Sequence, residues 1–248
     1  MKRRIITEIN KFSQSGEKHI KSNMENEDAL CSIKDSNSCV ISLCDGVSQC
    51  SMAKDGANIT CEAVSKLLCK KGKLFFDFPK DIIAKNILSH ILYEIRKEAT
   101  KASKDTDDYS STFASVLWDR KKDRIMCIGL GDSIVIAVGK QKCRVVLEPC
   151  ESFDGCVVTT TKGALEYVNI KIFDAKDIES VIILSDGAWR AIFEKNRMNE
   201  DAQTYIKNNN YELLVDCLKK KKIYDDYSFI SLDIRDKNRR KQWVTVSI

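Results

Sequence analysis

Acidic residues next to apolar stretches are the part of this sequence best suited to chemistry. Asp45 follows "CVISLC" and Asp186 follows "VIILS", and a glycine comes directly after each of them. Four further aspartates border apolar stretches in the same way: Asp28, Asp132, Asp225 and Asp226. If these stretches are strands whose ends meet at one rim of a sheet, the carboxylates repel one another and need a cation to stay ionised together.

Such a group of carboxylates is a candidate site for hard divalent cations. Oxygen ligands suit Mg²⁺ or Mn²⁺ better than soft metals, and the chain has only two histidines. Two such ions side by side can hold a phosphate and generate the hydroxide that attacks it. Asp-Gly is also a common turn dipeptide, so each corner taken alone is better explained as an ordinary turn. The metal hypothesis therefore depends on the ordered set of corners.

The elements that would hold these corners are strands and long helices. Stretches rich in β-branched residues predict strands at 38–44, 111–118, 124–130, 133–139, 143–148, 180–185, 227–234 and 242–248. Helical spacing of apolar residues predicts helices over 51–72 and 79–102, the second with a stripe of Ile83, Ile87, Ile91 and Ile95, and a third helical region near 199–221. We expect the strands over 111–148 to form an antiparallel meander. Helices grouped apart from strands indicate an α+β fold.

The composition predicts one soluble domain. The chain has 248 residues, of which 43% are hydrophobic, and it has no Gly/Ser-rich linker, so we predict a single domain over 1–248 in which the least regular segment, 149–179, forms a flap. No apolar run approaches the ~20 residues of a membrane helix, and the amino end lacks the apolar stretch of an export signal. We therefore expect a cytoplasmic monomer that does not bind membranes.

Cysteines and basic residues point to no separate site. The eleven cysteines are odd in number and mostly lie within apolar runs, which favours buried reduced thiols over disulfides or zinc. Lysines and acidic residues alternate along most of the chain, with 219–222 and 235–241 as basic exceptions; sparse aromatic residues in the carboxy-terminal stretch make a nucleic-acid partner the least favoured hypothesis. No cysteine is followed six residues later by arginine, and neither GxSxG nor GxxxxGK[ST] occurs.

Six motifs follow one another along the chain: "NED" (26–28), "SLCDGVS" (42–48), "SSTFASVLW" (110–118), "GLGDSIVIA" (129–137), "ILSDGAWR" (183–190) and "DDYSFISL" (225–232). In this order they resemble the motifs of the metal-dependent Ser/Thr protein phosphatases, the type 2C or PPM family. The resemblance spans nearly the whole chain, and "SGEKHIKSN" with "CDGVSQCSMAKDGA" is similar to a bacterial branch of that family. It implies a four-layer α-β-β-α sandwich, with two antiparallel sheets flanked by pairs of helices.

The resemblance also implies a metal centre. Asp45 matches a carboxylate that bridges two ions, and the carbonyl of Gly46 matches a further ligand. Asp186 and Asp225 match ligands of the second ion. Asp225 is preferred to Asp226 because the family pattern is Asp, then Asp or Asn, then an apolar residue, then Thr or Ser.

Further implied ligands complete the centre. Glu27 and Asp28 match an amino-terminal acidic pair that acts directly or through bound water. Asp132, together with Asp186, matches a position that can hold a weaker third ion. The implied cofactors are thus two Mn²⁺ or Mg²⁺ ions with room for a third. A water that bridges two of them would hydrolyse phosphoserine or phosphothreonine in a phosphorylated protein, with Asp45 and Asp186 as the catalytic carboxylates.

Three departures from the family pattern bear on activity. "DGVSQC" lacks two glycines that follow Asp-Gly in many relatives. Val47 stands where some relatives have a proton-donating histidine, and Asn23 stands where many have a phosphate-binding arginine. Lys21 and His19 are the nearby candidates for phosphate binding, and His19 also fits a structural role. The main alternative to an enzyme is a non-catalytic phosphatase-like binding module, which the loss of a core carboxylate would favour; none is lost.

Overall fold

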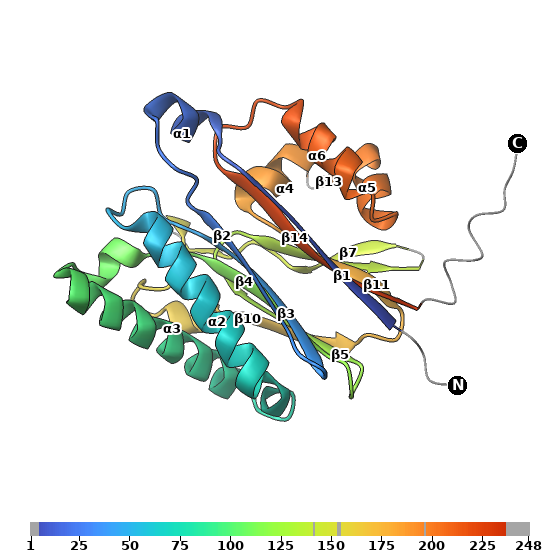
Figure 1. Ribbon diagram of the computed structural model, residues 1–248, viewed down its shortest axis with the longest axis horizontal. Helices are drawn as coiled ribbons and strands as arrows, with labels where there is room; N and C mark the ends of the chain where they lie inside the picture. The colour runs from blue at the N-terminus through green and yellow to red at the C-terminus, as the bar shows by residue number, and fades with distance from the viewer. Residues whose placement is uncertain (1–4, 141, 153–154, 196, 237–248) are drawn as a thin grey trace, which may run out of the picture.

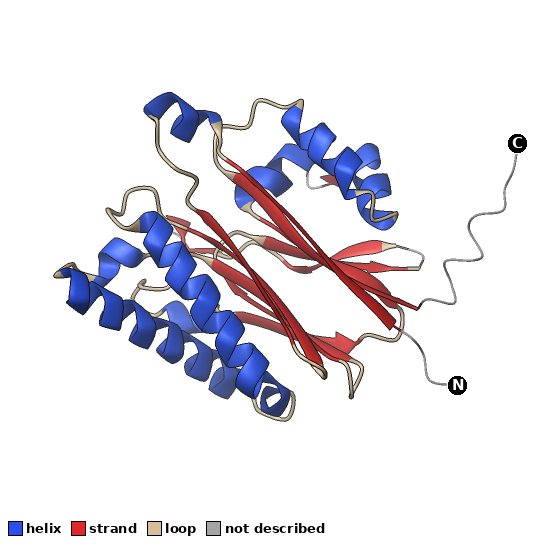
Figure 2. Ribbon diagram, in the orientation of Figure 1, coloured by secondary structure: helices blue, strands red, loops and turns tan. Residues whose placement is uncertain are grey.

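The computed structural model describes residues 5–140, 142–152, 155–195 and 197–236, and in this part of the chain the elements form four layers (Figure 1). Two five-stranded sheets face each other, and helices cover the outer face of each (Figure 2). The predicted α-β-β-α sandwich is thus confirmed. The strand expected at 242–248 and residues 237–241 of the basic stretch lie outside the described residues.

The first sheet joins the two ends of the described chain. Its strands are, in order, β1 (Ile5–Gln14), β14 (Tyr227–Asp236), β11 (Ile178–Leu184), β6 (Ile134–Gly139) and β7 (Cys143–Leu147). All neighbouring strands are antiparallel. The start of β14 therefore lies beside the end of β11, where two of the predicted acidic corners occur.

The second sheet is also antiparallel throughout. Its strands are, in order, β10 (Asn169–Asp174), β5 (Arg124–Leu130), β4 (Phe113–Asp119), β3 (Ser38–Asp45) and β2 (Asp28–Lys34). β2 and β3 form a hairpin whose open end carries two further acidic corners.

Helices cover both sheets on the outside (Figure 1). The second sheet is covered by α2 (Ala53–Phe75) and α3 (Lys80–Ala102), and the first by α4 (Asp186–Ile192), α5 (Glu200–Lys207) and α6 (Tyr211–Lys219). The short helix α1 (Glu17–Ser22) connects β1 to β2. Smaller elements are η1 (Thr106–Tyr109), η2 (Ala164–Tyr167), β8 (Glu151–Ser152), β9 (Gly155–Cys156), β12 (Phe193–Glu194) and β13 (Arg197–Met198).

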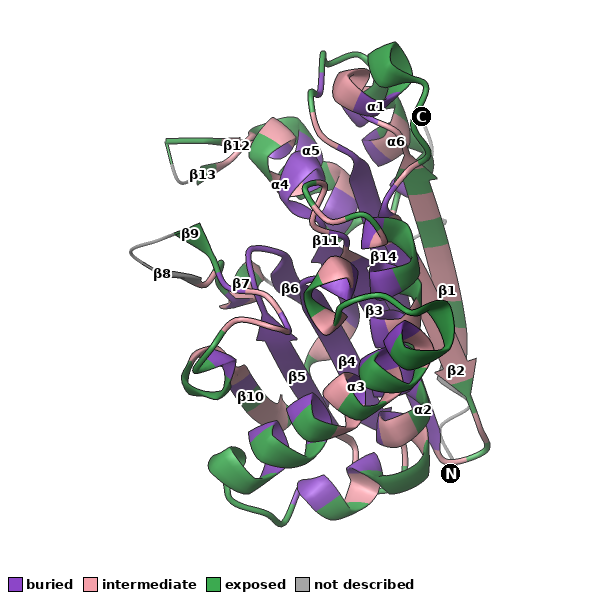
Figure 3. Cartoon of the chain, turned by 90° about the vertical axis from the view of Figure 1, so that its left-hand side faces the viewer, coloured by how far each residue is buried: buried purple, intermediate pink, exposed green. Residues whose placement is uncertain are grey.

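Three apolar cores hold the layers together, and β3 shows how. Successive side chains of a strand point to opposite faces. Cys39, Ile41 and Leu43 therefore pack in the core between the sheets, while Val40 and Cys44 pack in the core beneath α2 and α3. Figure 3 shows the result: the central strands are buried, and exposed residues lie on the helices, the loops and β1. This frame holds the strand ends at fixed positions.

The predicted helices are largely confirmed. The isoleucine stripe of α3, Ile83, Ile87, Ile91 and Ile95, is fully buried. The region near 199–221 contains two helices rather than one, because the side chain of Asn210 caps a new helix by accepting a hydrogen bond from the backbone N–H of Leu213 at 3.3 Å.

The predicted meander over 111–148 is wrong at its centre. β4 and β5 form one hairpin, and β6 and β7 form another. The second neighbour of β5 is β10, whereas the second neighbour of β6 is β11. The chain therefore crosses from one sheet to the other between β5 and β6. Gly131 takes a φ of 102° in this crossover, a conformation that favours glycine. β10 also lies within 149–179, so part of the expected flap belongs to a sheet.

Candidate active site

The ends of strands from both sheets bring five aspartates together: Asp28, Asp45, Asp132, Asp186 and Asp225. Asp28 begins β2 and Asp45 ends β3, and the two pair directly across the ladder. Asp132 lies in the crossover between β5 and β6, Asp186 begins α4 after β11, and Asp225 comes just before β14. Asp45 is close enough to the other four to feel their charges. We call these five residues the acidic cluster.

Burial and mutual repulsion make the acidic cluster costly to ionise. Burial is the main cause that raises the pKa of Asp45 well above its ordinary value, and the charges of Asp28 and Asp186 add to it. Burial likewise raises the pKa of Asp28 to about 8. The nearby Ser228 hydroxyl lowers the pKa of Asp28 in part, although its own hydrogen bond is donated to Ser13 Oγ at 2.8 Å. The cluster therefore favours a bound proton or cation.

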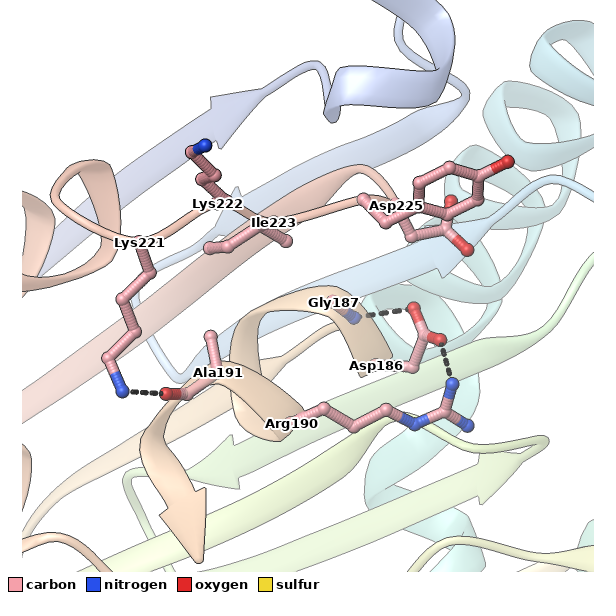
Figure 4. Close-up of a pocket in the computed structure, with 9 residues that line it drawn as sticks. Asp186, Gly187, Arg190, Ala191, Lys221, Lys222, Ile223 and Asp225 are labelled. Carbon is pink, nitrogen blue, oxygen red and sulfur yellow. Dashed lines mark hydrogen bonds and ion pairs between the residues drawn. The ribbon is translucent and has the colours of Figure 1, made fainter.

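The carboxylates of Asp186 and Asp132 both contact the guanidinium of Arg190. Arg190 Nη1 lies 2.8 Å from Asp186 Oδ2, and Nη2 lies 3.2 Å from Asp132 Oδ2. The other oxygen of Asp186 accepts the backbone N–H of Gly187 at 2.6 Å (Figure 4). The pKa of Asp186 still rises to about 6, because burial and the charge of Asp132 outweigh the guanidinium.

Close packing requires the glycine in each Asp-Gly corner. A Cβ on Gly46 would lie 2.4 Å from the carbonyl oxygen of Ala53 at the start of α2, and a Cβ on Gly187 would lie 2.2 Å from the carbonyl oxygen of Asp226. Both corners thus press against the backbone of a neighbouring element. This packing fixes the positions of Asp45 and Asp186. The role of the Gly46 carbonyl as a metal ligand stays a prediction.

Asp226 is engaged in a buried network that anchors the amino-terminal segment. Its Oδ1 accepts the N–H of Gly16 at 2.9 Å, and its Oδ2 accepts the N–H of Glu27 at 2.7 Å and lies 2.8 Å from His19 Nδ1. His19 Nε2 lies 3.4 Å from Glu27 Oε2, to which Ser48 Oγ donates at 2.7 Å. The Asp226 carboxylate is thus occupied by protein groups, and Glu27 belongs to the same network; the choice of Asp225 over Asp226 as a ligand stays a prediction.

The two candidates for phosphate binding lie in different environments. His19 is 1% exposed and is held between Asp226 and Glu27. Lys21 lies on α1 with its side chain 70% exposed, 2.6 Å from Glu17. Lys21 therefore keeps the better access to a substrate, and phosphate binding by either residue stays a prediction.

A cavity of about 340 Å³ opens beside Asp186 and Asp225. Its walls are α4 and residues 221–225 (Figure 4). The carboxylates lie together toward one end, and Lys221, which donates to the carbonyl of Ala191 at 2.5 Å, lies toward the other. The cavity thus offers both a place for cations and a positive wall for an anion.

The donor set fits hard divalent cations. Both carboxylate oxygens of Asp28 are buried, and neither has a hydrogen-bond partner within the described part of the chain. A buried carboxylate without a partner is unfavourable, and bound Mg²⁺ or Mn²⁺ would relieve it. Among the described residues, no three His, Cys, Asp or Glu side chains form a ready-made metal shell. Backbone oxygens and water, which Mg²⁺ commonly retains, would have to complete each shell.

Comparison with known families identifies the class of the protein. The family model described as Protein phosphatase 2C matches residues 15–220. Because the match covers most of the chain, the chain belongs to the protein phosphatase 2C family and is thereby classed with the protein serine/threonine phosphatases. No curated protein matches it closely enough to add to this.

Solved structures with the same fold share little sequence with this chain. A bacterial serine phosphatase has a TM-score of 0.68 and 12% identity, over 94% of this chain and 99% of that chain. Stp1 from Staphylococcus aureus gives 0.68 and 12%, over 95% and 98%. RsbX in complex with magnesium gives 0.59 and 12%, over 95% and 98%. These likenesses confirm the predicted sandwich.

Among the helices that the structure describes, none has the length and apolar character of a membrane span.

Exchange of Asp226 for asparagine is expected to destabilise the fold, whereas exchange of its neighbour Asp225 is not. An asparagine keeps one acceptor oxygen where Asp226 serves three donors; loss of a charge-assisted bond costs about 2 kcal/mol, or about 4–8 °C in Tm. Asp225→Asn removes one charge from a repulsive cluster, so Tm is expected to hold or rise. Thermal unfolding without divalent ions measures both variants. Equal losses of Tm would contradict this division of roles.

Two features of the site are not predicted by the sequence patterns. Arg190 stands four residues after Asp186 at the start of a helix, and this i,i+4 spacing was the available signal. The partners of Asp226 left no such signal, because Gly16 and Glu27 lie 210 and 199 residues away in the chain.

Proposed function

We propose that this chain hydrolyses phosphoserine and phosphothreonine in phosphorylated proteins, using two Mn²⁺ or Mg²⁺ ions bound at the acidic cluster. The observation that carries the proposal is the convergence of Asp28, Asp45, Asp186 and Asp225 from four places in the chain, with raised pKa values at the first three. Membership of the protein phosphatase 2C family supports a phosphoprotein substrate. The likeness to RsbX, solved in complex with magnesium, supports a divalent ion.

The proposed ligands divide according to their position. Asp45 feels the charge of every other member of the acidic cluster, and we assign it to the shared position that it matches in the family pattern. Asp28 lies opposite it across the ladder, and Asp186 and Asp225 line one cavity. Glu27 and the Gly46 carbonyl complete the proposed set. When bound, the ions supply Lewis acidity toward water and the phosphoryl oxygens.

The chain's own residues define what else the site offers. Val47 supplies no proton donor at its own position. Arg190 and Lys221 line the cavity, and their positive charge favours the approach of a phosphate group or an acidic peptide. Lys21 and His19 remain the proposed phosphate-binding residues from the amino-terminal segment.

Hydrolysis of p-nitrophenyl phosphate and of a phosphothreonine peptide tests the proposal. Turnover is expected with Mn²⁺ or Mg²⁺ and is expected to fall to background in EDTA, because the acidic cluster cannot activate water without a cation. A phosphotyrosine peptide serves as the comparison substrate and is expected to react more slowly.

Two outcomes would overturn the proposal in different ways. Undiminished turnover in EDTA would contradict the dependence on metal ions. Folded protein without turnover under any metal would favour the non-catalytic binding module, and binding of the phosphothreonine peptide would then be the next measurement.

A further inference from the structure

Arg190 places a permanent positive charge beside two members of the acidic cluster, Asp132 and Asp186. Its guanidinium lies 2.8 Å from Asp186 and 3.2 Å from Asp132, whose side chains are only 7% and 11% exposed. An arginine side chain stays protonated at every physiological pH. The Asp132–Asp186 pair is therefore neutralised in part by the protein itself.

Neighbouring contacts hold this guanidinium in place. The indole N–H of Trp189 donates to the carbonyl oxygen of Asp132 at 2.8 Å, so α4 is tied to the crossover that carries Asp132. The Arg190 guanidinium also lies 5.5 Å from the centre of the Trp189 ring, within the range of a cation–π contact. The Arg190 side chain is 51% exposed, but these contacts hold its guanidinium at a defined position.

The environment of Asp28 differs from that of the Asp132–Asp186 pair. Asp28 has two buried oxygens without a hydrogen-bond partner in the described part of the chain. Asp186, in contrast, already uses Oδ1 for the N–H of Gly187 and Oδ2 for Arg190. The demand for a cation is therefore greater at Asp28 than at the Asp132–Asp186 pair.

We propose that Arg190 is a built-in cation that takes the place of a third divalent ion at the Asp132–Asp186 pair, so that the site holds two ions. The inference rests on the proposed function and deepens it by fixing the number of ions. An ion at this pair would displace or face the guanidinium, and two like charges a few ångströms apart repel each other. Arg190 is thus a positioning residue: it acts by holding Asp132 and Asp186.

Counting bound Mn²⁺ by equilibrium dialysis tests the inference without any activity measurement. The wild type is expected to bind two ions per chain, and Arg190→Gln is expected to bind three. Arg190→Lys keeps the charge and is expected to stay at two. Lys222→Gln is the matched control, because Lys222 lines the same cavity and its loss removes one positive charge away from the Asp132–Asp186 pair.

A second variant locates the added ion. Asp132→Asn alone is expected to leave the wild-type count at two, whereas Asp132→Asn combined with Arg190→Gln is expected to return the count from three to two. If Arg190→Gln fails to fold, the wild-type count and its insensitivity to Asp132→Asn still test the inference.

The possible failures are distinguishable. Three ions on the wild type, or two on folded Arg190→Gln, would overturn the role of Arg190 and leave the proposed function standing. A wild type that binds no Mn²⁺ would overturn the metal-dependent function itself, together with this inference.

Discussion

Replacement of Asp45 by asparagine is expected to lower metal-dependent hydrolysis of p-nitrophenyl phosphate by about 10³-fold or more, as loss of a central electrostatic group does in other enzymes. Asp45 feels the charge of all four other members of the acidic cluster, and its carboxylate is the one that we propose two ions share. Asparagine keeps the shape but removes the negative charge. Initial rates at saturating Mn²⁺ measure the effect.

A matched control separates this effect from the loss of an ordinary turn aspartate. Asp119 ends β4, opposite Ser38, at the far end of β3 from Asp45. It is 2% exposed, and its Oδ1 accepts the N–H groups of Lys121 and Lys122 at 2.9 and 3.3 Å. Asp119→Asn is expected to change the rate by less than about twofold. If Asp45→Asn behaves like this control, the first Asp-Gly corner is only a turn.

The central strands could be predicted from the sequence because both of their faces are buried. β3 and β4 pack between the other sheet and the helices, so their residues form continuous apolar runs with clear ends. The prediction of β5 was correct to the residue, since charged turn residues precede it and glycine follows it. The acidic corners were visible for the same reason: a carboxylate at the end of such a run stands out.

The elements that the sequence did not reveal lie mainly at the edges. β1, β2 and β10 are edge strands, and two of them show the mixed burial that weakens an apolar pattern. The failed meander has a different cause. Strands that follow one another usually pair, and only the three-dimensional packing reveals that the chain changes sheets at Gly131.

The acidic cluster was predictable as a set, but its internal balance was not. Charge type and position along the chain identified every carboxylate in it. Which of them already has a partner depends on contacts between residues far apart in the sequence. Arg190 contacts Asp132, 58 positions earlier, and Asp226 contacts Gly16, 210 positions earlier. Sequence patterns describe neighbours along the chain. They therefore could not separate the carboxylates that contact other protein groups from those that we propose bind a metal ion.

Without divalent ions, the protein is expected to lose stability as the pH rises from about 5.5 to 8.5. The pKa values of Asp28 and Asp186 rise to about 8 and about 6 in the fold, above the ordinary value near 4. Between the ordinary and the folded pKa the native state binds more protons than the unfolded state, so its stability falls with rising pH. Asp28→Asn removes one of these groups and is expected to raise Tm at pH 8 and flatten the profile.

Divalent ions are expected to reverse this loss, because they replace the protons. Mn²⁺ at about 1,000 times its Kd would stabilise the fold by about 4 kcal/mol, or about 8–16 °C in Tm. The rise is expected to be largest at pH 8 and smaller at pH 5.5, where protons compete with the ion. Thermal unfolding with Mn²⁺ or with NaCl of equal ionic strength measures the difference, and Asp45→Asn is expected to lose most of it. A rise that is the same at both pH values, or unchanged in Asp45→Asn, would mean that the ion binds elsewhere than at the acidic cluster.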